Sequence, residues 1–221
     1  MCGRFALHHS WNEMHESYNL IRPEDVGRNV PPRYNIAPTQ DVLFVANDQS
    51  DRRLLEGRWW LVPFWAKEIP KWTLFNARNE DAYKKPAFRE AFKSRRCLIP
   101  ASGFFEWTKA EDGGKDPHYI YLPDHQPFAF AGLWATNDKL EITSCTILTA
   151  PAVAEIEHLH HRMPIILNSD QYEHWLDVDT GVDKARELLK HSRGTELVSH
   201  RVSRAVNNSR ASGAELIEAL S

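Results

Sequence analysis

The chain has 221 residues, of which 42% are hydrophobic, and its formal net charge at pH 7 is −3. This length fits one domain with a sizeable core, and the slightly negative charge excludes a uniformly basic nucleic-acid coat, so any contact with phosphate needs a local patch. The three cysteines have no paired spacing, which argues against a disulfide framework and against a zinc site built on cysteine pairs.

The chain starts Met1-Cys2-Gly3-Arg4-Phe5. Because Cys2 is small, we expect removal of Met1, which would leave a terminal cysteine with an α-amine and a thiol on adjacent carbons. The amine, with an ordinary pKa of about 8, could form an imine with an aldehyde, and the thiol could then close a five-membered thiazolidine ring. Alternatively, the thiol could attack an amide with the amine as base, or Cys2 could be an ordinary buried cysteine.

The further elements follow in chain order. Residues 29–38 are rich in proline and are expected to be extended or turn-like. β-Branched and aromatic runs between turn signals predict strands over Val42–Ala46, Leu54–Val62, Cys97–Thr108, Tyr119–Leu122, Phe128–Thr136 and Ile142–Thr149, with a loop at 111–117. Helices are expected over Trp11–Tyr18, Glu80–Lys93, Val153–His158, Ser169–Trp175, Asp183–His191 and Ala214–Leu220. These elements predict a single α+β domain over residues 1–221, with a mainly antiparallel, curved or barrel-like β core and peripheral helices.

Two polar residues follow a short apolar run in the middle of the chain. Asn76 could hold a terminal amine, and Arg78 could bind a phosphate through its two-pronged guanidinium. Alternatively, Asn76 caps a helix and Arg78 pairs with an acid. The stretch 78–96 carries seven basic residues against three acidic ones, so it is the best candidate for an electrostatic footprint on DNA, although such a run is also typical of a solvated helix face.

An acidic residue stands among aromatic ones in Gly103-Phe104-Phe105-Glu106-Trp107. Strand alternation places Glu106 on the same face as Phe104. A carboxyl group in apolar surroundings has a raised pKa, which suits it for proton transfer. The alternative is a solvent-facing glutamate on an edge strand.

Three histidines lie within four residues, at His158, His160 and His161. Because no cysteine or acidic ligand stands at a recognised spacing, we do not expect a metal site. A single histidine acting as acid or base fits better, and Arg162 beside it could hold a phosphate. Residues 202–208 are expected to form a polar loop that could close over a site.

Together, these segments resemble the SRAP family (SOS response-associated peptidase), which includes proteins that shield abasic sites in single-stranded DNA by covalent attachment. The resemblance rests on residues 1–5, 33–38, 76–78, 97–101, 103–107, 160–164 and 202–207, in this order. It implies catalytic roles for Cys2, Asn76, Glu106 and His160. It also implies DNA contacts by Gly3, Arg4, Asn35, Trp65, Arg78, Lys85 and Arg162, without a metal or cofactor.

The resemblance further implies how the protein would work. Cys2 would form a thiazolidine with the ring-opened sugar, Asn76 would position the amine, Glu106 would move protons, and His160 would assist ring opening. The partner would be single-stranded DNA with an abasic site, including sites at junctions with a duplex, and replication proteins are further candidates. The family name suggests self-processing at the Met1–Cys2 bond. We expect a monomer in the cytoplasm, nucleoid-associated when bound to DNA, since no apolar run approaches transmembrane length and no signal peptide is evident.

Two positions depart from the family pattern. Trp60 stands where the family usually has glycine, and Asp81 stands where it often has threonine. A bulky Trp60 could change the shape of a DNA groove, and Asp81 adds a negative charge near the expected path of the phosphates.

Two other functions fit parts of the sequence. N-terminal-nucleophile glutamine amidotransferases also begin Met-Cys-Gly, but this sequence lacks their Asn-Gly-Glu segment and leaves no room for a synthase domain. A non-covalent single-strand binding module fits less well, because such affinity depends on positive charge. Cys2→Ser would separate the two DNA functions, since plain binding should survive this change and covalent capture should not.

Overall fold

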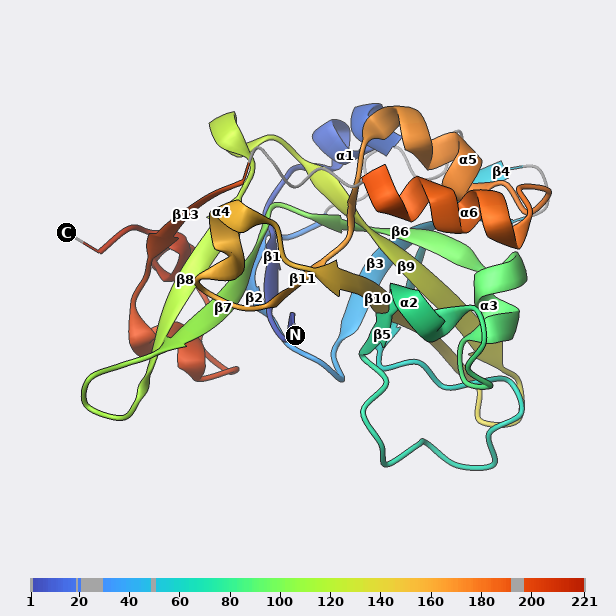
Figure 1. The fold of residues 1–221 in the computed structure, drawn as a ribbon, viewed down its shortest axis with the longest axis horizontal. Coiled ribbons are helices and arrows are strands. Elements are labelled where there is room, and N and C mark those ends of the chain that lie inside the picture. The colour runs from blue at the N-terminus through green and yellow to red at the C-terminus, as the bar shows by residue number, and fades with distance from the viewer. Residues whose placement is uncertain (1, 19, 21–29, 49–50, 192–196, 221) are drawn as a thin grey trace.

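A computed structural model describes residues 2–18, 20, 30–48, 51–191 and 197–220. Five of the described strands close into a barrel (Figure 1). They are β3 (Asp41–Asp48), β4 (Asp51–Trp59), β6 (Arg96–Ala101), β9 (Phe128–Asn137) and β10 (Ile142–Pro151). Neighbours run in the order β10, β4, β3, β6 and β9, and β9 pairs back with β10 to close the circle. The pairings are antiparallel except that of β4 with β10.

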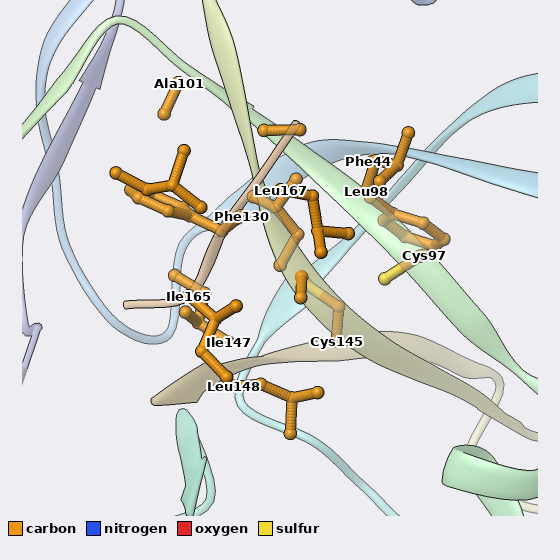
Figure 2. Close-up of a cluster of buried hydrophobic side chains, with 14 of the residues drawn as sticks. Phe44, Cys97, Leu98, Ala101, Phe130, Cys145, Ile147, Leu148, Ile165 and Leu167 are labelled. Carbon is orange, nitrogen blue, oxygen red and sulfur yellow. The ribbon is translucent and has the colours of Figure 1, made fainter. Parts of the chain in front are cut away.

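The barrel is built around a packed apolar core. Figure 2 shows part of it, with Leu98, Phe130 and Ile147 among the labelled side chains, and all three are fully buried. Three short strands extend the barrel sheet: β5 (Asn76–Arg78) and β11 (Arg162–Pro164) pair with β10, and β12 (Ile166–Leu167) pairs with β9. Burial of this apolar surface is the main favourable contribution to folding.

A second, antiparallel sheet lies beside the barrel (Figure 1). Its order is β13 (Val198–Arg201), β8 (Lys115–Tyr121), β7 (Gly103–Lys109), β1 (Phe5–Leu7) and β2 (Arg33–Ile36). The N-terminal residues therefore lie between two halves of the molecule, since β1 pairs with β7 while Phe5 packs edge-to-face against Trp59 and Phe130 of the barrel. This junction positions the candidate site.

The helices lie at the periphery. They are α1 (Trp11–Tyr18), α2 (Asn79–Ala82), α3 (Arg89–Ser94), α4 (Ala154–Glu157), α5 (Tyr172–Leu176) and α6 (Val182–Leu188). Short 3-10 turns are η2 (Pro123–His125), η3 (Ser169–Gln171), η4 (Leu189–His191), η5 (Arg204–Asn207) and η6 (Ala214–Ile217). The predicted fold class, α+β with a mainly antiparallel, barrel-like core, is confirmed.

Several predicted boundaries are wrong for local reasons. The expected strand 97–108 is two strands, because Ser102 turns the chain from the barrel to the second sheet: its N–H donates to Ala6 O (2.8 Å) and its hydroxyl accepts from His8 N (2.9 Å). The expected helix 80–93 splits into α2 and α3 around Pro86, whose ring lacks an N–H to donate.

Other boundaries differ at the ends of elements. Strand β8 begins at Lys115, so the loop expected at 111–117 is shorter. The extended segment is described from residue 30 onward and includes β2, whereas residue 29 lies outside the described residues. The helix expected at 214–220 is the 3-10 turn η6. Strands β1, β5, β11, β12 and β13 were not predicted, since two to four residues carry no readable alternation.

Gly132 in β9 is expected to be indispensable for barrel packing. A Cβ there would lie 2.8 Å from Cys97 Sγ and 2.9 Å from Ile99 Cδ1, so Gly132→Ala must displace these two buried side chains of β6. We expect a loss of roughly 1–3 kcal/mol of unfolding free energy, the usual cost of overpacking a core. Urea unfolding measures it, and Gly181→Ala, where nothing lies within 4 Å of the added carbon, is the matched control. Equal midpoints for the two variants would contradict this packing.

Candidate active site

Cys2 is fully buried directly before β1. Its thiol donates to the carbonyl of Arg4 (3.7 Å), and its own carbonyl accepts a hydrogen bond from Asn76 Nδ2 (2.7 Å). Asn76 is the first residue of β5, and this strand pairs in parallel with β10. The pairing fixes the position of Asn76. The alternative that Asn76 caps a helix is wrong, since the N-cap of α2 is Arg78, without a side-chain cap.

Glu106 is buried in β7, with 3% of its surface exposed. Strand β7 lies between β8 and β1, so the alternative of a solvent-facing edge glutamate is also wrong. Burial raises the pKa of Glu106 to about 7. Burial, and next the charge of Glu106, raise the pKa of the Cys2 thiol well above its ordinary value. The thiol is therefore protonated at neutral pH and needs a base beside it.

His160 lies between α4 and β11, and β11 pairs with β10. Its Nδ1 accepts from the N–H of Arg162 (3.0 Å), and its ring stacks on His161 with centroids 4.4 Å apart. Burial lowers the pKa of His160, so its imidazole is neutral at pH 7. The described residues contain no cluster of three or more His, Cys, Asp or Glu side chains placed to hold a metal ion.

Arg4 lines a hollow of about 450 Å³ together with Gly3, Trp107, Lys115 and Asn207. Its Nη1 donates to Asn35 Oδ1 (2.6 Å) and to Val206 O (2.7 Å), and its guanidinium lies 5.8 Å from the Trp107 ring centroid. Asn35 is thus a support for Arg4.

Within residues 202–208, Asn207 lines this hollow, and the 3-10 turn η5 stands where a loop was expected. Asn35 Nδ2 donates to Asn208 O (3.0 Å), and Asn207 Oδ1 accepts from Trp107 Nε1 (2.6 Å). The sequence interpretation did not select Trp107 and Asn207 as site residues, although both stand in segments that it singled out.

A second hollow, of about 400 Å³, gathers four of the predicted residues: Trp65, Asn76, Arg78 and Lys85. The segment between β4 and β5, at the lower right of Figure 1, forms its rim. Phe64, Trp65 and Trp72 on this segment are about half exposed or more, at 62%, 48% and 58%. Asn76 both lines this hollow and binds Cys2, while Gly3 lines the first one, so Cys2 lies between the two hollows.

Two predicted DNA-binding cations form ion pairs within the protein. Arg162 is buried and binds Glu80 through both guanidinium arms, at 2.5 and 3.0 Å. Lys85 Nζ lies 2.8 Å from Asp81 Oδ2, so the carboxylate that replaces the family's threonine has a cation as its partner.

Trp60, the other position that departs from the family pattern, packs against the rest of the segment between β4 and β5. Its Nε1 donates to Pro70 O (3.2 Å), and its ring lies 5.7 Å from that of Phe75. This tryptophan is half-buried, and its hydrogen bond to Pro70 ties it to the rest of that segment.

The fold and site define an α+β barrel protein with a buried, N-terminal cysteine between two surface hollows. Residues 1–209 match the sequence model of the family described as SOS response associated peptidase (SRAP), so the chain belongs to this family and the resemblance is confirmed. It is 37% identical to abasic site processing protein YoaM of Bacillus subtilis, over 99% of this chain and 98% of the relative. It is 32% identical to abasic site processing protein YedK of Escherichia coli, over 99% of both chains.

The chain is also similar to a vertebrate protein in sequence and to a solved bacterial structure in fold. Abasic site processing protein HMCES of Gallus gallus is 32% identical over 74% of this chain and 56% of the relative. A crystal structure of a Bacteroides thetaiotaomicron protein shares the fold, with a TM-score of 0.81 at 21% identity over 99% of this chain and 100% of the other. Among the described residues, no helix is long and apolar enough to cross a membrane.

Proposed function

We propose that this protein processes abasic sites in DNA by capturing the ring-opened sugar covalently through Cys2. The observation that carries this function is the position of Cys2, whose carbonyl is fixed by Asn76 and whose thiol lies within the electrostatic influence of Glu106. The names of the relatives, abasic site processing proteins, support the same substrate.

The reaction begins once Met1 is removed, by self-processing or by an aminopeptidase. The α-amine of Cys2 attacks the C1′ aldehyde of the lesion and forms a carbinolamine. Glu106, half protonated near neutral pH, donates a proton to the departing hydroxyl, so that water leaves and an imine forms. The imine keeps its N–H proton, the thiol adds to the carbon of this protonated imine, and the thiol proton passes to the Glu106 carboxylate, which restores the acid. One water is lost in total, and the product is a thiazolidine.

His160 and the cationic residues act on the DNA itself. A neutral His160 takes the proton of the C1′ hydroxyl as the C1′–O4′ bond breaks, and it returns that proton to O4′, so that the ring opens to the aldehyde. Arg4, Arg78 and Arg162 bind the flanking phosphates. Asn35 supports Arg4, Gly3 permits close approach of the backbone, and Lys85 adds a backbone contact.

The strand is bound single-stranded around the lesion. Trp65 is half exposed at the rim of the second hollow, where an unpaired base could stack on it. A base paired within a duplex has both faces covered by its neighbours, so this contact favours single strands or their junctions with a duplex.

Intact mass spectrometry tests the function. The protein is incubated with three single-stranded DNAs of one sequence: one with an abasic site, one with the same site reduced to the alcohol, and one undamaged. We expect an adduct equal to the protein without Met1 plus the DNA minus one water, with the aldehyde DNA alone. No adduct from a protein that lacks Met1 would overturn covalent capture, and glutamine hydrolysis would then be measured as the alternative.

A further inference from the structure

Helix α2 places two neighbouring carboxylates against two of the proposed phosphate-binding cations. Glu80 pairs with Arg162 of β11, and Asp81 pairs with Lys85 one turn later. The helix directly follows β5, the strand that carries Asn76, and it directly precedes the turn that carries Lys85. Both carboxylates therefore contact cations to which the proposed function assigns phosphates.

The Glu80 pair resembles a phosphate complex in its geometry. Each carboxylate oxygen of Glu80 accepts a hydrogen bond from one of the two terminal nitrogens of Arg162. An arginine binds two oxygens of a phosphate group in the same way. Arg162 is held further by Thr149 O (2.7 Å), so its guanidinium cannot swing away to meet DNA elsewhere. The hydrogen bond from Arg162 is the main cause of the lowered pKa of Glu80. The Glu80 carboxylate is therefore ionised at neutral pH.

The Asp81 pair is more open. The two side chains are 38% and 53% exposed, and the main-chain bond from Lys85 N to Asp81 O (3.1 Å) keeps them on one side of the turn. Ion pairs this exposed contribute little to stability. Lys85 lines the second hollow, so its charge faces the expected path of the strand.

We infer that Glu80 and Asp81 compete with DNA phosphates for Arg162 and Lys85, and thereby limit how tightly the protein holds undamaged DNA. This inference rests on the proposed function, because it takes both cations as phosphate ligands. A protein that captures its lesion covalently does not need tight reversible binding. Each internal ion pair removes one cation from the set that neutralises the strand, so intact DNA is released more readily.

Salt-dependent binding of an undamaged single-stranded oligonucleotide tests the inference. We expect Asp81→Asn to bind about two- to five-fold more tightly than the wild type, as expected when a weak surface ion pair no longer competes. The slope of log affinity against log salt should steepen by about 0.7, the value for one more phosphate contact on a single strand. Glu80→Gln should steepen it similarly through Arg162.

Matched variants separate this effect from a general change in charge. Asp81→Glu keeps the carboxylate and should restore the wild-type slope. Asp183→Asn removes one carboxylate from an ion pair with Arg186 on α6 and should leave the slope unchanged. Unchanged affinity and slope in Asp81→Asn would overturn the inference, whatever the fate of Glu80→Gln. Capture of abasic DNA by the wild type, measured in parallel, decides the proposed function separately.

Discussion

Cys2→Ala is expected to abolish stable capture of abasic DNA while retaining a transient imine. Alanine is small enough for Met1 to be removed, so the variant keeps the α-amine and loses only the thiol. The amine can still form an imine, but without sulfur no ring closes, and water hydrolyses the imine again. Mass spectrometry should therefore find no adduct after quenching, whereas borohydride added during incubation should trap a reduced one.

This variant also separates covalent capture from binding. The thiol is buried, donates to the carbonyl of Arg4 and lines neither hollow, so its loss removes no side chain from either one. Affinity for undamaged single-stranded DNA should stay within about two-fold of the wild type, a difference well under 1 kcal/mol. A stable adduct on Cys2→Ala would mean that another nucleophile does the chemistry.

The candidate site could be predicted in part because its residues stand in short, distinctive segments. The residue patterns leave alternatives open for Asn76 and Glu106, the resemblance to the SRAP family selects both, and both are buried beside Cys2 or within its electrostatic reach. The strands that carry these two residues fix their positions, because β5 pairs with β10 and β7 lies between β8 and β1. The burial of these two polar side chains fits a role at the site, since buried polar groups need partners, while their catalytic roles stay predictions.

The supporting contacts could not be predicted, because they join distant parts of the chain. Arg4 is held by Val206, 202 residues away, and Arg162 by Glu80, 82 residues away. The second pairing exists only because α2 and β11 both pack on β10. The same limit applies to the fold: the class followed from the order of strands, whereas the turn at Ser102 depends on its bonds to residues 6 and 8.

Glu106→Gln is expected to slow capture by roughly 10²–10⁴-fold, the usual contribution of a positioned acid or base. Glutamine fills nearly the same space but neither gives nor takes a proton under these conditions. In the wild type, the rate should rise as the α-amine becomes neutral near its ordinary pKa of about 8. It should fall as Glu106, with a pKa of about 7, loses the proton that assists the departure of water. Single-turnover rates should therefore give a bell-shaped pH profile, and a flat one would remove Glu106 and His160 as proton carriers.

A stability measurement distinguishes this chemical role from a structural one. Burial raises the pKa of Glu106 from 4.5 in the unfolded chain to about 7 in the folded one, so the folded state binds more protons between these values. The wild type should therefore lose stability as the pH rises from 4.5 through 7, because a buried carboxylate must then ionise. Glu106→Gln has no such proton to lose, and its unfolding free energy relative to the wild type should increase over the same interval. A variant that is slow in capture yet more stable at pH 8 would have lost a proton carrier from an intact site, whereas one that is equally destabilised at every pH would have lost a structural residue.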